Sequence, residues 1–346
     1  SVVCGAIETV WCHPSNSNIL LCGPVGGGVF KTKNAKAGNN IKWELKSDAI
    51  IGITKINSDI FDSSNLVAVG GESSALRTLS FPFSGYNKEG ILVSEDQGET
   101  WNLKKIALDV DKNEIEYLDL NDVVVWDKNI LVSAHRYGSM MTTRSHEEKY
   151  NKMFGKGGIF FSPDFGNNWV HLDITTNEEP VVYNKLYQSI PSMEITYYEN
   201  KVRIYVCILG DGIYRWAQEN SFDVLSSSSI WTKVSTGTLD YSIRKEGTYW
   251  PAVFGSATMD LSTYGSGITS WKSNNNIFIT TSKNNQNYVY VMTVNNSIAS
   301  GFFYSSDSGT TWTEVDLPRT SIIPQSDNMF AISELYDGLQ PITKKD

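Results

Sequence analysis

The 346-residue chain is poor in the residue types that mark several common functional classes. Its 29 Lys and Arg are outnumbered by 38 Asp and Glu, and the formal net charge is −9. Nucleic-acid binding needs dense Lys and Arg to displace counterions from phosphates, so a nucleic-acid partner is not expected. No apolar run approaches the roughly 20 residues that span a bilayer, so membrane insertion is not expected either.

Cysteine is scarce as well. The four cysteines (Cys4, Cys12, Cys22 and Cys207) are too few for a disulfide scaffold, and no C-x-x-C pair predicts a zinc site. A Cys4–Cys12 or Cys12–Cys22 bridge is sterically conceivable, with buried free thiols as the alternative. The chain also lacks a Gly-x-Ser-x-Gly elbow, a phosphate-binding Gly-rich loop and a His-Glu-x-x-His motif. We therefore expect neither a cofactor nor a metal ion.

What the sequence does contain is a repeat. Three segments align without gaps on the pattern S-x-D-x-G-x-x-W, and each follows a glycine and a short apolar run. The Ser and Asp side chains can bond backbone groups within a tight turn, and the glycine supplies a positive φ. The matching residues are Ser94, Asp96, Gly98, Trp101, Ser162, Asp164, Gly166, Trp169, Ser305, Asp307, Gly309 and Trp312.

Two degenerate copies extend the repeat. Gly28–Asn34 leads to Trp43, and Gly212–Trp216 leads to Trp231. Counted by subtraction, the five marker tryptophans lie 58 to 81 residues apart, which suits four-stranded blades with insertions. The 10 Trp, 17 Tyr and 27 Gly also suit a β protein rich in tight turns.

The pattern predicts an all-β fold, a single β-propeller over residues 1–346 with four-stranded antiparallel blades. Six blades are expected, and five or seven remain open. A sixth blade could use the strand candidate Ile268–Trp271 in the long interval before Trp312. The segment Asn328–Leu335 could supply a strand that closes the ring.

These turns resemble those of the Asp-box (BNR repeat) propellers, which include sialidases, xyloglucanase-type glycoside hydrolases, sortilin-like receptor domains and a plant photosystem assembly factor. The resemblance covers most of the chain, but it consists only of the recurring sequence pattern and its spacing. It implies that each Asp-box turn joins the third and fourth strands of a blade, on the face away from the binding cleft. Asp96, Asp164 and Asp307 are then expected to be structural rather than catalytic.

Function is accordingly expected on the opposite, top face, where the sequence has insertions near residues 70–90 and 136–158. The candidate binding residues are Arg77, His135, Arg136, Tyr137, Arg144 and Trp250. Long insertions can also be tolerated surface loops, and any single aromatic residue can serve inter-blade packing instead.

The resemblance does not extend to the chemistry of the known enzymes. A sialidase needs an arginine triad, whereas this chain has seven arginines and none before Arg77. In the xyloglucanase-type enzymes the first blade carries a catalytic Asp in an Asp-Val-Gly-Gly turn, and Pro24 stands in its place here. Asp211, in a similar Gly-Asp-Gly turn, is the one candidate catalytic carboxylate, and a simple hairpin turn is the alternative.

The sequence therefore favours a non-catalytic binding module that recognises a protein or glycan partner through its top-face loops. One alternative is a glycoside hydrolase of the xyloglucanase-like type acting on a polysaccharide. Another is a structural module of a cell-surface or virion assembly. An extracellular or cell-surface location is favoured over a cytoplasmic one, and the oligomeric state is left open.

Overall fold

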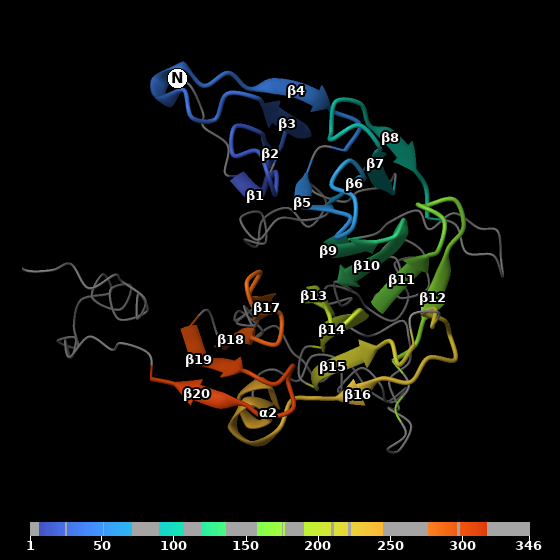
Figure 1. Cartoon of the computed structure of the whole chain (residues 1–346), viewed down its shortest axis with the longest axis vertical. Helices are drawn as coiled ribbons and strands as arrows, with labels where there is room; N and C mark the ends of the chain where they lie inside the picture. The colour runs from blue at the N-terminus through green and yellow to red at the C-terminus, as the bar shows by residue number, and fades with distance from the viewer. Residues whose placement is uncertain are drawn as a thin grey trace, which may run out of the picture.

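The structure is a computed structural model. It describes residues 7–24, 26–50, 52–70, 90–106, 119–135, 158–174, 176, 190–208, 211–220, 223–244, 276–295 and 298–316. These residues form five four-stranded antiparallel sheets, each built from four consecutive strands in chain order. Figure 1 shows the sheets following one another around a common centre, with the first strand of each sheet innermost and the fourth outermost.

Sheet 1 contains β1 (Ile7–Cys12), β2 (Leu20–Pro24), β3 (Val29–Thr32) and β4 (Glu44–Ser47). Sheet 2 contains β5 (Ile53–Ser58), β6 (Leu66–Gly70), β7 (Ile91–Ser94) and β8 (Asn102–Lys104). Sheet 3 contains β9 (Asp119–Trp126), β10 (Asn129–His135), β11 (Gly158–Ser162) and β12 (Val170–Leu172). Sheet 4 contains β13 (Ser192–Tyr198), β14 (Lys201–Ile208), β15 (Gly212–Ala217) and β16 (Thr232–Lys233). Sheet 5 contains β17 (Asn276–Thr281), β18 (Val289–Asn295), β19 (Ile298–Ser305) and β20 (Thr313–Val315). The helices are η1 (Gly38–Asn40) and α2 (Gly237–Arg244).

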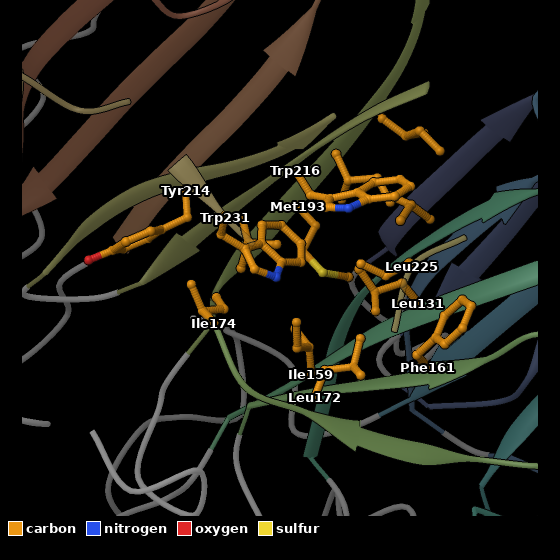
Figure 2. Packing of buried hydrophobic residues seen from close by; sticks show 14 of the residues in the cluster. Leu131, Ile159, Phe161, Leu172, Ile174, Met193, Tyr214, Trp216, Leu225 and Trp231 are labelled. Carbon is orange, nitrogen blue, oxygen red and sulfur yellow. The ribbon is translucent and has the colours of Figure 1, made fainter. Parts of the chain in front are cut away.

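The core lies between consecutive sheets. Every residue of β6, β7 and β11 is buried, because both faces of these strands pack against neighbouring sheets. This double burial explains why they read as continuous apolar runs instead of alternating ones. Four apolar clusters join sheets 1–2, 2–3, 3–4 and 4–5. Figure 2 shows the third of them, in which Trp231 and Met193 of sheet 4 lie beside Leu131 and Ile159 of sheet 3.

The three S-x-D-x-G-x-x-W segments, called the box turns below, connect the third and fourth strands of sheets 2, 3 and 5. In each turn the Ser hydroxyl donates to the Asp carboxylate, at 2.8, 2.9 and 2.7 Å. The same Ser oxygen accepts the glycine N–H at 2.8, 2.8 and 2.7 Å. The residue before each glycine is also left-handed, with φ of 60° at Gln97, 55° at Phe165 and 58° at Ser308.

The marker tryptophans directly precede the fourth strands β4, β8, β12, β16 and β20. The degenerate copy in sheet 1 keeps only the Ser–Asp part of the box geometry, with different residues, since its fifth-position N–H, that of Lys36, bonds Asn18 Oδ1 at 3.4 Å. Thr32 Oγ1 donates to Asn34 Oδ1 at 2.9 Å, and Asn34 N donates to Thr32 Oγ1 at 3.2 Å. A Thr–Asn pair therefore takes the place of Ser–Asp in this turn.

Glycines just before the third strands allow the third and fourth strands to approach closely. Gly28 has φ of 83° and Gly90 has φ of 110°. A Cβ atom would lie 1.9 Å from the Ser47 carbonyl oxygen at the first position and 2.0 Å from that of Lys104 at the second. Any side chain here would push the fourth strand away.

Cys12, Cys22 and Cys207 are free thiols. Cys12 lies opposite Leu20 and Cys22 opposite Val10 in the β1–β2 register, so the conceivable Cys12–Cys22 bridge is not formed. Burial raises the pKa of Cys22 and of Cys207, which keeps both thiols protonated and unreactive. Cys4 lies outside the described residues.

The described residues account for five sheets and contain no strand pairing that joins sheet 1 to sheet 5. The strand candidates Ile268–Trp271 and Asn328–Leu335 both lie outside the described residues. Six blades and the closing strand therefore remain predictions.

Candidate functional site around the innermost strands

The two ends of the sheets differ in what they carry. The box turns lie at the end where third strands lead to fourth strands, which we call the box end. At the other end, the loop end, second strands finish at Gly70, His135 and Ile208. The innermost strands begin at this loop end, since Ile53 pairs with Gly70 and Ser192 with Cys207.

Polar and charged side chains of the innermost strands meet in the loop-end half of β5, β9 and β13, and Thr280 of β17 joins them. This axial cluster consists of Lys55 (β5), Asp122 (β9), Ser192 and Glu194 (β13), and Thr280 (β17). The Lys55 ammonium nitrogen lies 3.5 Å from Asp122 Oδ1. Attraction to Asp122 raises the pKa of Lys55, against the opposing effect of burial. Lys55 is 40% exposed, so its charge remains available to a ligand.

Asp122 ties the innermost strands of sheets 3 and 4 together. Its side chain is 6% exposed. Oδ2 accepts hydrogen bonds from Met193 N at 2.9 Å and Ser192 Oγ at 3.4 Å, while Oδ1 accepts from Val123 N at 2.8 Å. These donors and Lys55 hold the carboxylate in place at the centre of the molecule.

Glu194 has a strongly shifted pKa. Burial raises its pKa to about 7, outweighing a hydrogen bond from Ile195 N and the attraction of Lys55. The negative charge of Asp122 adds to the rise, and a hydrogen bond with Thr280 opposes it. Near neutral pH Glu194 thus exists in both forms, and its neutral form can donate a hydrogen bond.

Aromatic side chains meet at the box end of the same strands. The rings of Phe61, after β5, and Tyr197, in β13, pack edge to face with centroids 4.8 Å apart. Asp59 fixes the turn, since its carboxylate accepts hydrogen bonds from Phe61 N at 2.9 Å and Lys128 N at 2.8 Å. The charged cluster and this apolar contact therefore divide the innermost strands into a polar and an apolar end.

Asp211, the predicted candidate carboxylate, lies just before β15 and is 9% exposed. Tyr214 OH donates to its Oδ2 at 2.7 Å, and Lys233 Nζ lies 3.7 Å from its Oδ1. Lys233 Nζ also donates to the Asp211 carbonyl at 2.9 Å. The structure thus places Asp211 in a satisfied network of sheet 4, and its catalytic role stays a prediction.

The other predicted binding residues are not brought together within the described part of the chain. His135 is the last residue of β10, which places its backbone at the loop end. The remaining candidates lie outside the described residues: Arg77, Arg136, Tyr137, Arg144 and Trp250.

Sequence reasoning missed Lys55, Asp122 and Glu194. The available signal was a charged residue inside a short innermost strand, as in ITKINS of β5 and SMEITYY of β13. A charged residue at the third position of an otherwise largely apolar innermost strand, in more than one repeat unit, indicates a shared polar centre.

Comparison with known proteins gives a structural match only. No family model and no curated protein matches the chain. Among solved structures, PorZ, an essential bacterial surface component of the type-IX secretion system of Porphyromonas gingivalis, matches 91% of this chain and 34% of its own. The identity is 11% and the TM-score 0.50. The chain has a β-propeller fold.

Other propeller matches are more distant. An ancestral GH74 enzyme matches with TM-score 0.48 and 13% identity over 90% of this chain and 31% of its own. The β-propeller domain of Cps50 (Swd1) from Myceliophteria thermophila matches with TM-score 0.41 and 9% identity over 90% and 86%. The propeller described here spans about a third of the length of PorZ and of the GH74 enzyme.

Two further observations concern the described residues of this propeller. No three His, Cys, Asp or Glu side chains within them lie close enough together to hold a metal ion. None of their helices is long and apolar enough to cross a membrane.

Proposed function

We propose that the chain is a propeller of the Asp-box type that binds a protein or glycan partner at its loop end without catalysing a reaction. The observation that carries the proposal is the axial cluster, in which the half-exposed Lys55 stands beside Asp122 and Glu194 at that end. Burial of charged groups is costly, and titratable groups with altered pKa values cluster at functional sites, so such a group is a candidate for recognition.

The chemistry of the cluster suits a neutral polar ligand. The Lys55 ammonium can donate to a carbonyl or hydroxyl oxygen, and neutral Glu194 can donate as well. Two donors and one fixed carboxylate match the hydroxyl groups of a sugar or the amide groups of a peptide. The chain also leaves sheet 2 after Gly70 and re-enters it at Gly90 on this end, and we propose that the inserted segments add contacts through Arg77, Arg136, Tyr137 and Arg144.

An array of polysaccharide fragments and a peptide display library would identify the ligand. Lys55→Met should then weaken binding of the selected ligand by about tenfold or more, the loss of one charge-assisted hydrogen bond. Glu95→Gln, at an exposed box-end ion pair, is the matched control and should bind normally. Unchanged binding by a folded Lys55→Met protein would contradict the proposal.

The glycoside hydrolase hypothesis has one specific observation in its favour. Glycosidases use a protonated acid beside an ionised carboxylate, and Glu194 has a pKa of about 7 next to Asp122. Release of reducing sugar from xyloglucan tests this second candidate. Release that is abolished by Glu194→Gln or Asp211→Ala, in a protein that still folds, would replace the binding-only proposal with an enzyme.

We also propose an extracellular or cell-surface location, in keeping with the resemblance to Asp-box proteins. Labelling of intact cells with an antibody against the chain tests it directly. Signal only after permeabilisation would refute this location and leave the binding proposal untouched.

A further inference from the structure

Each box turn packs against the sheet that precedes it, and the three resulting junctions can be compared position by position. A Cβ atom added to Gly98 would approach Leu21 of sheet 1, one on Gly166 would approach Lys104 of sheet 2, and one on Gly309 would approach Tyr205 of sheet 4. The residue directly after the box glycine is Glu99, Asn167 and Thr310 in turn. The side chain at this position differs in its ability to accept a hydrogen bond from a cation of the preceding sheet.

At the junction of sheets 1 and 2 the chain supplies its own carboxylate. Lys31 Nζ, on a side chain that is 2% exposed, lies 2.7 Å from the Gln97 carbonyl and 2.6 Å from Glu99 Oε1. Lys33 and Lys46 reach the same carboxylate at 2.8 and 3.0 Å. Partial burial opposes ionisation of Glu99, but the hydrogen bonds from the three lysines prevail and lower its pKa to about 2.

At the junction of sheets 2 and 3 an amide takes the place of the carboxylate. Lys104 Nζ donates to Asn167 Oδ1 at 2.7 Å. The left-handed residue here is the buried Phe165, which packs in the same apolar cluster as Val93 of sheet 2. This junction, too, is filled by the chain's own side chains.

The junction of sheets 4 and 5 keeps the cation but lacks the acceptor. Arg215 is the third residue after Gly212, as Lys31 is the third after Gly28. Its Nη1 donates to the Ser308 carbonyl at 2.5 Å, just as Lys31 bonds Gln97. Thr310 occupies the position of Glu99, and its hydroxyl turns back to the Asp307 carbonyl at 2.9 Å.

An open cavity of about 490 Å³ lies at this junction. Arg203 and Arg215 line it together with Lys201, Glu199, Glu219 and Asp307. Arg203 is 14% exposed, and its Nη2 lies 3.9 Å from Glu199 Oε2. Its Nη1 is buried and has no hydrogen-bond partner among the described residues. Leaving a buried guanidinium nitrogen without an acceptor costs free energy. The side chain therefore has a donor that an external acceptor could satisfy.

We propose that this cavity binds the carboxylate of an external ligand, in the place that Glu99 fills at the junction of sheets 1 and 2. Arg203 and Arg215 provide two guanidinium groups in the lining, and Arg203 still carries a donor, Nη1, that has no acceptor among the described residues. The three acidic residues that share the lining disfavour a dianion such as phosphate and leave a monoanionic carboxylate as the matching charge. The site lies at the box end, so it is independent of the function proposed for the loop end.

The decisive variant installs the missing carboxylate. Thermal shift and calorimetric titration would use the monoanion butyrate and the peptide mimic N-acetylglutamate N-methylamide, with inorganic phosphate as a third probe. Thr310→Glu should raise Tm and abolish carboxylate binding, because the new side chain occupies the site. Thr310→Val, which is isosteric and neutral, is the control and should still bind. Arg203→Met should weaken binding by about tenfold or more.

Binding of butyrate alone would identify a small organic acid as the ligand, and equal binding of the peptide mimic would identify an acidic peptide side chain. Both results support a carboxylate site. Phosphate binding as tight as carboxylate binding would overturn the proposed selectivity. Absence of carboxylate binding to a folded wild-type protein, or full binding to Thr310→Glu, would overturn the site itself.

Discussion

The box aspartates and Glu194 of the axial cluster are all carboxylates, yet the chain treats them in opposite ways. Asp96 accepts hydrogen bonds from Ser94 Oγ at 2.8 Å, Thr100 N at 2.9 Å and Thr100 Oγ1 at 2.6 Å. Partial burial opposes ionisation of Asp96, but these bonds outweigh it and lower its pKa. Glu194, with fewer donors and deeper burial, has its pKa raised instead.

The opposite pKa shifts distinguish carboxylates that stabilise a turn, such as Asp96, from a carboxylate that can still bind or release a proton near neutral pH, Glu194. A box aspartate uses its acceptor capacity within its own eight-residue turn, so nothing remains for a ligand. Glu194 depends on residues from sheets 2, 3 and 5, and its charge state is not settled near neutral pH. The following predictions test this distinction, starting with the largest expected effect.

The first prediction concerns a box aspartate. Asp164→Ala removes four hydrogen bonds, from Ser162 Oγ, Asn167 N, Asn168 N and the Asn168 side chain. We expect unfolding to become easier by about 2–4 kcal/mol, since several backbone donors lose their acceptor. Chemical denaturation measures it, with Asp164→Asn as the control that keeps one acceptor oxygen. A loss below about 0.5 kcal/mol, the usual size for an inert surface position, would remove the distinction.

The second prediction uses the ion cluster at Glu99. Because the folded-state pKa is about 2 and the ordinary value is 4.5, the cluster stabilises the protein fully above pH 4.5. This stabilisation is lost as the pH falls from 4.5 towards 2. We expect Glu99→Gln to remove a contribution on the order of 1 kcal/mol after solvent screening. Urea unfolding at pH 7 and pH 3 checks it, and an equal deficit at both pH values would contradict the assignment.

The third prediction concerns Glu194, whose folded pKa of about 7 lies above its ordinary value of 4.5. The folded state binds more protons than the unfolded state between these values, so this group costs stability as pH rises from 4.5 to 7. Relative to the wild type, Glu194→Gln should therefore gain stability at pH 8 compared with pH 5, by an amount on the order of 1 kcal/mol. Glu95→Gln, at the exposed box-end pair, serves as the control. A pH-independent difference would show that Glu194 is ionised throughout.

The smallest expected effect is a change in a pKa without a change in fold. The positive charge of Lys55 lowers the pKa of Glu194, so Lys55→Met should raise it further. Carbon-13 NMR of the labelled Glu194 carboxyl group follows the titration. A lower pKa in this variant would mean that Lys55 does not face Glu194.

The turns and strands could be predicted because their causes are local. Ser94, Asp96 and Gly98 bond within one turn, and Trp101 falls just before the next strand, so spacing alone locates them. The degenerate copy that contains Thr32 and Asn34 could be located from the same order of glycine, turn and tryptophan. The predicted top-face residues that lie outside the described residues, such as Arg77, remain predictions.

The axial cluster could not be predicted because its contacts cross sheets. Lys55 and Asp122 are far apart in the sequence, and their 3.5 Å contact depends on how β5 and β9 pack. The raised pKa of Glu194 likewise follows from burial among strands of four different sheets. The sequence placed Asp211 in a Gly-Asp-Gly turn, but its contact with Lys233 depends on the pairing of β15 with β16.

The order of the strands bears on how the molecule is made. Every sheet uses four consecutive strands, and every apolar cluster joins a sheet to the next one in the chain. Synthesis from the N-terminus can therefore complete sheet 1 before the residues of sheet 3 exist, and each new sheet then finds a finished surface on which to dock. Because each strand pairs with its neighbour in the chain, every step closes a smaller loop than pairing between distant sheets would, and its entropic cost is correspondingly smaller.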